Sequence, residues 1–110
     1  MRRIMGYFDG SILVSTGSVT EFPVSIRLEQ NYPNPFNSST IIEYSLPTPT
    51  DVSLTVFSIL GNTVETLVDE RKQAGTHRVA WRPGTASSGV YLYRLQTERY
   101  TTTRKLLLIR

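Results

Sequence analysis

Cysteine is absent from the 110-residue chain, which excludes disulfide bridges, thiolate nucleophiles and zinc–sulfur sites. Histidine occurs once, at His77, so any imidazole metal site or serine–histidine catalytic arrangement would have to use that residue. No apolar run approaches the ~20 residues of a membrane-spanning helix, and no segment of adequate length has a helical period. These absences favour a fold of short strands, and we expect no direct insertion into a membrane.

The formal net charge is +3, which raises the question of nucleic-acid binding. A phosphate-binding face needs clustered cations, because its affinity comes from several contacts that release counterions together. The basic residues are instead spread over different predicted strands: Arg27, Arg78, Arg82, Arg94, Arg99 and Arg104. Scattered charge of this kind is typical of a solvated sheet surface, and we expect no nucleic-acid partner.

The chain divides into two zones of different character. Residues 1–25 mix Gly, Ser and Thr with short apolar stretches, which is typical of a linker or of the remnant of a preceding region. The basic start is followed by an apolar stretch that ends at Asp9 and Gly10. This stretch is shorter than the ~7–15 apolar residues of a signal-peptide core, so we expect no signal peptide in this chain. Residues 26–110 have the pattern of one small domain.

Apolar and polar residues alternate in short segments of the second zone, between turn signals. The predicted strands cover residues 40–46, 52–56, 63–68, 76–82, 90–96 and 101–109, with a tight turn over 60–62 and a charged loop over 69–75. Segment 90–96 is apolar at nearly every position, which is typical of a central strand covered on both sides. We predict an all-β fold, an immunoglobulin-like antiparallel β-sandwich of about seven strands, with bulky core residues Tyr44, Trp81, Tyr91 and Tyr93.

Catalytic groups are not apparent in the sequence. His77 lies in a predicted strand, in phase with Val79 and Trp81 and without a neighbouring carboxylate, so a structural role is expected. Asp69 and Glu70 are adjacent, so on a strand their side chains point to opposite faces. No glycine-rich loop has the strand–loop–helix setting that binds phosphate. We therefore expect no enzyme, no metal site and no cofactor.

Five segments carry unusual local sequence choices. Residues 28–40 read LEQNYPNPFNSST, where the prolines exclude helix and where Tyr32 and Phe36 can cover one end of the sandwich. Segments 56–64, 74–81, 86–95 and 103–110 read VFSILGNTV, AGTHRVAW, ASSGVYLYRL and TRKLLLIR. Over residues 28–110 the chain resembles the type A C-terminal sorting domain of type IX secretion, with its motifs LxQNYPNPFNPST, VYDxLGRxV, AGxHxVxWD, LASGVYxYRL and TRKMxLxK. It departs from the customary Pro, Asp, Asp and final Lys at Ser38, Ser58, Arg82 and Arg110.

The resemblance implies a secretion signal. Family members are cargo that crosses the inner membrane by an N-terminal signal, after which outer-membrane machinery recognises this domain. A cell-surface sorting peptidase then removes the domain, and the cargo is released or attached to surface lipopolysaccharide. By motif match, the residues expected to carry recognition are Gly89, Tyr91, Lys105 and Arg110. Lys105 and Arg110 flank an apolar tail that could add as a strand to a partner, whereas Gly89 and Tyr91 also fit plain structural roles.

Two other functions stay open at this stage. The same segments resemble the immunoglobulin-like module of flagellar hook-capping proteins, which would make the domain an assembly scaffold. A sorting signal must lie at the C-terminus, and the match that runs to the last residue favours sorting. An adhesion or carbohydrate-binding sandwich would require exposed aromatic residues, for which Tyr100 and Trp81 are the candidates. Fold alone does not choose among these functions.

Overall fold

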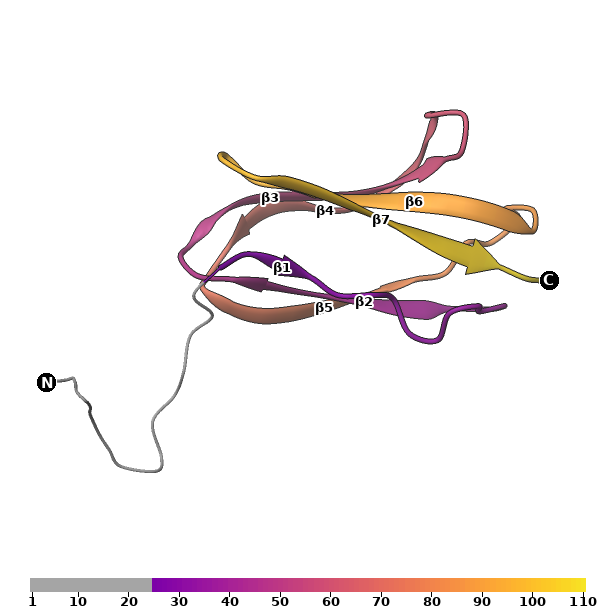
Figure 1. Ribbon diagram of the computed structural model, residues 1–110, viewed down its shortest axis with the longest axis horizontal. Helices are drawn as coiled ribbons and strands as arrows, with labels where there is room; N and C mark the ends of the chain where they lie inside the picture. The colour runs from indigo at the N-terminus through magenta and orange to yellow at the C-terminus, as the bar shows by residue number, and fades with distance from the viewer. Residues whose placement is uncertain (1–24) are drawn as a thin grey trace, which may run out of the picture.

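The computed structural model describes residues 25–110, which form two antiparallel β-sheets packed face to face (Figure 1). The expected linker over residues 1–25 lies, except for Ser25, outside the described residues. In the described part no helix is present that could cross a membrane. The strands in chain order are β1 (Arg27–Leu28), β2 (Thr40–Leu46), β3 (Thr50–Ser58), β4 (Thr63–Lys72), β5 (Gly75–Trp81), β6 (Gly89–Gln96) and β7 (Thr101–Leu108).

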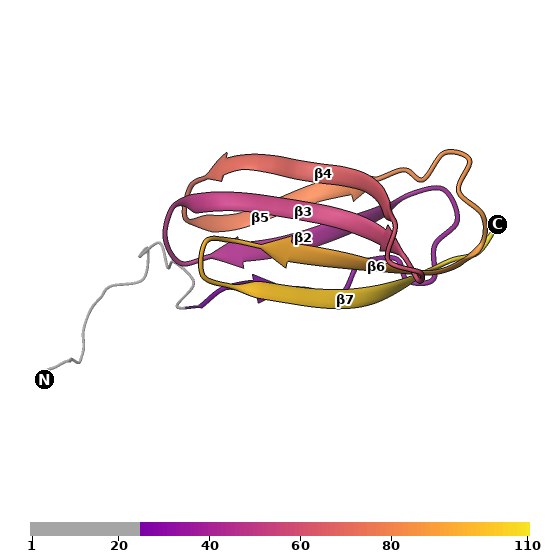
Figure 2. The same cartoon turned by 90° about the horizontal axis from the view of Figure 1, so that it is seen from above.

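One sheet has the strand order β1-β2-β5 and the other the order β4-β3-β6-β7 (Figure 2). Every pair of neighbouring strands is antiparallel. The predicted all-β, immunoglobulin-like sandwich is therefore confirmed. Alternation dictates the packing, because every second residue of β2, β3 and β6 points between the sheets. All four aromatic residues predicted for the core are buried: Tyr44, Trp81, Tyr91 and Tyr93.

Strand β6 is central in its sheet, but the prediction that both of its faces are covered is wrong. Tyr91, Tyr93 and Leu95 are buried, whereas Val90 and Arg94 are exposed on the opposite face. The sandwich has two layers only, so the outer face of each described sheet has no layer above it. An apolar run cannot by itself distinguish a doubly covered strand from a strand with one apolar face turned to solvent.

The charged stretch 69–75 was predicted to be a loop, and this is wrong for its first half. Strand β4 continues to Lys72, with Asp69 opposite Ser53 and Arg71 opposite Asp51. The Arg71 guanidinium lies 3.6 Å from the Asp51 carboxylate. β4 is an edge strand, and charged side chains are common on edges because they discourage pairing with other chains. The connection to β5 is reduced to Gln73 and Ala74.

The predicted turn at 60–62 is confirmed. The Ser58 amide donates to the Asn62 carbonyl at 2.8 Å, and the Gly61 amide donates to the Ser58 carbonyl at 2.9 Å. Gly61 has a φ of +94°, a conformation that other residues adopt only with strain. The β3–β4 pairing shifts register between Leu54 and Thr55 and again between Val56 and Phe57. Such irregularities increase local twist, and the end of this hairpin rises away from the sheet in Figure 1.

The segment between β1 and β2 is only partly in the position predicted for it. Phe36 is buried and packs on Trp81, with ring centroids 5.6 Å apart. Tyr32 is 79% exposed, so the expectation that it covers an end of the sandwich is wrong. Its backbone is nevertheless fixed, because Tyr32 and Ile41 exchange two hydrogen bonds of 2.9 and 2.8 Å. Backbone pairing therefore directs this ring outward.

A buried polar cluster joins the same segment to both sheets. The Tyr93 hydroxyl, on β6, donates to the Glu29 carbonyl at 2.7 Å and accepts from the Asn31 amide at 2.8 Å. The Asn31 side chain donates to the Thr40 hydroxyl of β2 at 2.9 Å and to the Pro33 carbonyl at 3.1 Å. Buried polar groups are costly unless they are paired, so these mutual bonds fix the path of the segment.

The first prediction concerns this cluster. Tyr93→Phe removes one hydroxyl and leaves the Asn31 amide and the Glu29 carbonyl without that partner. We expect the free energy of unfolding to fall by about 1–3 kcal/mol, as measured by urea unfolding with Trp81 fluorescence. Tyr100→Phe makes the same chemical change at an exposed site and should change stability by less than about 0.5 kcal/mol. Equal effects of the two substitutions would contradict the role assigned to Tyr93.

The second prediction follows from ionisation of the same residue. Burial raises the pKa of Tyr93 to about 12, although the hydrogen bond from the Asn31 amide opposes this. An unfolded tyrosine ionises near pH 10, so the stability that requires the neutral phenol is complete below pH 10 and is lost as the pH rises towards 12. We expect wild-type stability to fall between about pH 9 and about pH 11.5, and Tyr93→Phe to lose less over that interval. Urea titrations at the two pH values measure the difference, and equal losses would refute it.

Candidate recognition surface at the loop end

Three of the four residues expected to carry recognition converge on the loop that connects β5 to β6. The Tyr91 hydroxyl donates to the Ser87 carbonyl at 2.6 Å. The Tyr91 ring is buried and meets Trp81 edge-on, with centroids 5.6 Å apart. Gly89 starts β6 opposite Leu108 near the end of β7. The fold therefore brings Gly89, Tyr91 and Arg110 together at the β5–β6 loop, whereas Lys105 lies elsewhere.

Arg110 is bound to the loop through both its backbone and its side chain. Its amide donates to the Ser88 hydroxyl at 2.9 Å. In the guanidinium group, Nε donates to the Ala86 carbonyl at 2.7 Å and Nη2 donates to the Gly84 carbonyl. The planar guanidinium fixes its donors in one geometry, which a lysine ammonium does not reproduce. Arg110 therefore acts as a clamp on the loop as well as a surface cation.

Gly89 is required by backbone conformation and not by lack of space. Its φ is +152°, and a Cβ atom built on it would meet nothing within 4 Å. A larger residue would therefore fit but would be strained. This geometry supports the structural role considered for Gly89, namely the turn into β6.

Lys105 lies on a different surface. It is paired with Leu92 across β6 and β7, and its side chain is exposed on the outer face of the four-stranded sheet. Lys105 and Arg110 are five residues apart, which in an extended chain is about 16 Å. The two tail cations thus do not form one binding site by themselves.

The tail was expected to offer an addable strand, and the structure shows that the C-terminal half of its edge is already occupied. The Phe36 amide donates to the Leu107 carbonyl at 3.1 Å, and the Ile109 amide donates to the Phe36 carbonyl at 2.8 Å. The Asn34 side chain accepts from the Leu107 amide at 3.0 Å. Gln30 donates to the Lys105 carbonyl at 2.8 Å. A partner strand could pair there only after displacing residues 30–36.

These edge contacts were not predicted from the sequence. The Asn34 side chain accepts a hydrogen bond from an amide 73 residues away, which no pattern within residues 28–40 indicates. Arg82, which the sequence shows as a scattered cation and as a departure from the family motif, lines a shallow depression of about 520 Å³ with Asn37, Gly84 and Arg110. The prolines around Asn34 signalled a fixed extended segment, but no local pattern indicated that it would run beside the tail.

His77 has the structural surroundings expected of it. A ring nitrogen lies 2.8 Å from the Gln73 carbonyl, and the ring stacks on Tyr44 with centroids 5.3 Å apart. Among residues 25–110, no three histidine, aspartate or glutamate side chains form a group that could hold a metal ion. Several of the scattered cations pair with carboxylates on the surface, such as Arg78 with Glu43 at 3.0 Å and Arg27 with Glu29 at 3.4 Å.

The third prediction separates the clamp from the charge at Arg110. Arg110→Lys keeps the charge but loses the fork that holds two carbonyl oxygens. We expect faster amide hydrogen exchange at Ala86 and its neighbours in Arg110→Lys, nearly as fast as in Arg110→Ala, because the loop opens more often. Lys105→Ala is the matched control and should leave exchange in this loop unchanged. Wild-type exchange rates in Arg110→Lys would show that charge alone holds the loop.

The comparisons with known proteins agree with this geometry. The secretion system C-terminal sorting domain family matches residues 30–109, which is most of the chain. No curated protein matches it. One solved structure with the same fold is PorZ, described as an essential surface component of the type IX secretion system of Porphyromonas gingivalis. The identity is 17% and the TM-score 0.51, and the likeness covers 77% of this chain and 11% of the PorZ chain. The chain therefore belongs to the family of secretion system C-terminal sorting domains, which direct proteins through type IX secretion.

Proposed function

We propose that the outer-membrane machinery of type IX secretion recognises this domain in its folded state. The family match over residues 30–109 carries the proposal, since sorting domains of this family act as export signals. Export by this route leads to the cell surface or to the medium. Sorting domains are generally not catalytic, and we propose that this domain has no enzymatic activity of its own. The sandwich then serves as a rigid carrier of the surface that the machinery reads.

The four expected recognition residues have different parts in this proposal. Arg110 and Tyr91 hold the β5–β6 loop through the Gly84, Ala86 and Ser87 carbonyls. Gly89 permits the turn into β6. Lys105 is the one of the four whose exposed side chain makes neither a hydrogen bond nor an ion pair within residues 25–110. We assign direct contact to Lys105 first, and to Arg110 through whatever part of its guanidinium the loop leaves accessible.

A cell-surface sorting peptidase is the second proposed partner. Its cleavage point should precede Leu28, because β1 is paired with β2 through Arg27↔Ser45 and Leu28↔Tyr44. Residues held in a sheet are poor protease substrates, since a protease must bind its substrate as a free extended segment. Cleavage before β1 would separate the cargo and leave the sandwich whole.

The alternative functions gain little from the structure. Trp81 is completely buried, which removes it as a stacking platform for sugars, and of the two aromatic candidates only Tyr100 is exposed. A hook-capping scaffold would share the sandwich, but a shared fold does not establish a shared function.

The fourth prediction tests sorting directly. Residues 20–110 are fused behind a signal peptide and a reporter in a host that has type IX secretion. We expect reporter in the medium or on the cell surface, and periplasmic reporter in the same host without its outer-membrane machinery. Measurement is by reporter activity in separated fractions.

Resistance of the fused domain to proteolysis shows whether it is folded, and this decides how a failure of export is interpreted. If the fusion stays in the periplasm of both hosts and the domain resists proteolysis there, the sorting role is wrong. If it leaves both hosts equally, export does not depend on type IX secretion and the proposal is equally wrong.

A further inference from the structure

The outer face of the four-stranded sheet changes character along its strands. At one end Ser53, Gln96 and Thr101 lie opposite one another across β3, β6 and β7, with Asp69 on β4 beside them. In the next row Thr55 and Arg94 are paired. Residues directly opposite on one face of a sheet are in contact. The polar end of the face therefore consists of hydroxyl, amide and carboxylate groups.

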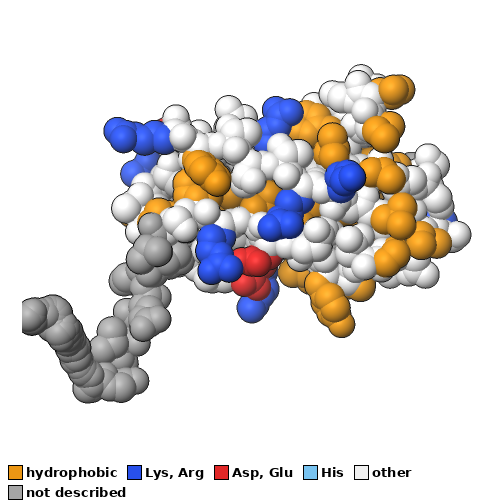
Figure 3. Space-filling model, in the orientation of Figure 1, with side chains coloured by type: hydrophobic (Ala, Val, Ile, Leu, Met, Phe, Trp, Pro, Cys, Tyr) orange, Lys and Arg blue, Asp and Glu red, His pale blue; other side chains and the backbone are white. Residues whose placement is uncertain are grey.

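The other end of this face is apolar. Phe57 is paired with Leu92, and Val90 with Leu107. Beyond them the β3–β4 turn exposes Ile59 and Leu60, of which Leu60 is 85% exposed. Figure 3 shows hydrophobic side chains gathered around the raised hairpin at this end of the molecule. We call this the outer apolar surface: Phe57, Ile59, Leu60, Val90, Leu92 and Leu107.

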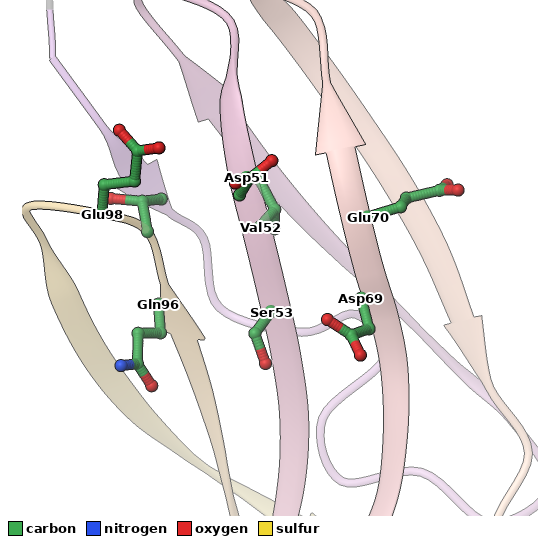
Figure 4. A pocket seen from close by; sticks show the side chains of 8 residues that line it. Asp51, Val52, Ser53, Asp69, Glu70, Gln96 and Glu98 are labelled. Carbon is green, nitrogen blue, oxygen red and sulfur yellow. The ribbon is translucent and has the colours of Figure 1, made fainter.

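Two cations border the outer apolar surface without anionic partners in residues 25–110. The Arg94 guanidinium lies 4.5 Å from the centre of the Phe57 ring. Lys105 is paired with Leu92. The nearby carboxylates of this face, Asp51, Asp69 and Glu98, are grouped at its opposite end (Figure 4). The apolar end is therefore both hydrophobic and positively charged at its border.

We propose that the outer apolar surface docks onto a protein of the outer-membrane secretion machinery, at a site where apolar side chains are flanked by carboxylates. This inference rests on the proposed sorting function and assigns a surface to it. Contiguous exposed apolar patches on small domains commonly mark interaction sites. The unpaired cations give the patch a charge preference, because complementary charge steers association and suppresses wrong partners.

Charge and shape argue against two other occupants. In a two-fold dimer of the apolar ends, Arg94 and Lys105 of one copy would face either the same cations or the apolar turn of the other, depending on the direction of the axis, and neither arrangement offers them a carboxylate. A planar bilayer would reach the raised turn at Ile59 and Leu60 first, but not the half-buried side chains on the sheet below it. A protein surface can provide both the carboxylates and a shape that is complementary to the raised turn and the sheet below it.

The fifth prediction uses the reporter fusion with two double variants. Arg94→Glu/Lys105→Glu reverses the bordering charges, and Ile59→Ser/Leu60→Ser removes the most exposed apolar side chains. We expect each to reduce exported reporter by at least about tenfold, as for residues central to an interface. Neither variant changes a buried residue, so both should unfold at the wild-type urea concentration.

The matched controls make the same kinds of substitution outside the outer apolar surface. Arg99→Glu reverses the charge of an exposed cation that likewise has no ion-pair partner in residues 25–110, and Tyr32→Ser/Ile41→Ser removes two exposed apolar side chains. Both controls should be exported as the wild type. Wild-type export of the surface variants, or equal loss in the controls, would overturn the docking surface.

A second measurement keeps this inference distinct from the sorting role. Because the chain has no cysteine, Leu60→Cys and Ile41→Cys each offer one thiol for a photoactivatable cross-linker in living cells. We expect position 60 alone to cross-link to an outer-membrane protein, at a peptide with apolar residues beside Asp or Glu, even if export is not completed.

Cross-linking with an unexported wild-type fusion would leave docking supported and sorting wrong. Cross-links to a second copy only, to lipid only, or to nothing would refute docking. So would sedimentation of the purified domain with anionic phospholipid vesicles if Ile59→Ser/Leu60→Ser abolishes it.

Discussion

The hydrogen bonds of the buried Tyr93 hydroxyl fix the element on which the rest of the architecture depends. They hold residues 29–31 against β6, while Asn31 reaches across to Thr40 on β2. From that point the chain continues along the tail, which places Phe36 on Trp81 and beside Leu108. One polar contact within an apolar core therefore decides how a proline-rich connection closes the sandwich. A misplaced connection would leave buried donors and acceptors without partners, which is the larger cost.

The covered tail has a consequence for recognition. An exposed edge strand invites pairing with any other extended chain, and Gln30, Asn34 and Phe36 prevent this over the end of β7. Specific recognition then has to use side chains on a face and not free backbone groups. Tyr91 and Arg110 stabilise the loop at this end, and Lys105 remains on the open face of the sheet. Tyr91 thus maintains the fold and Lys105 is available to a partner, whereas Arg110 takes part in both.

The alternation of apolar residues was enough to predict strands β2 to β7, the sandwich and the aromatic core, because period-two patterning is a local property, but it did not predict the two-residue strand β1. The errors arose where a distant partner decides the outcome. Stretch 69–72 is strand because β3 pairs with it, and Tyr32 is exposed because Ile41 pairs with its backbone. Arg110 could be selected as a cation from its motif, but its bonds to the Gly84 and Ala86 carbonyls depend on a loop more than twenty residues earlier. The outer apolar surface was hidden for the same reason, since cross-strand register assembles it.

A signal assembled by register exists only in the folded domain. The two cations that border the outer apolar surface come from β6 and β7, and its apolar side chains come from β3, β6, β7 and the β3–β4 turn. In the unfolded chain these groups are separated by up to about fifty residues and have no fixed relation. Machinery that binds such a surface would therefore recognise the sorting domain only when the domain is folded. The Tyr93 cluster would then contribute to sorting without contacting any partner, because it holds the segment that supports the strand on which Lys105 lies.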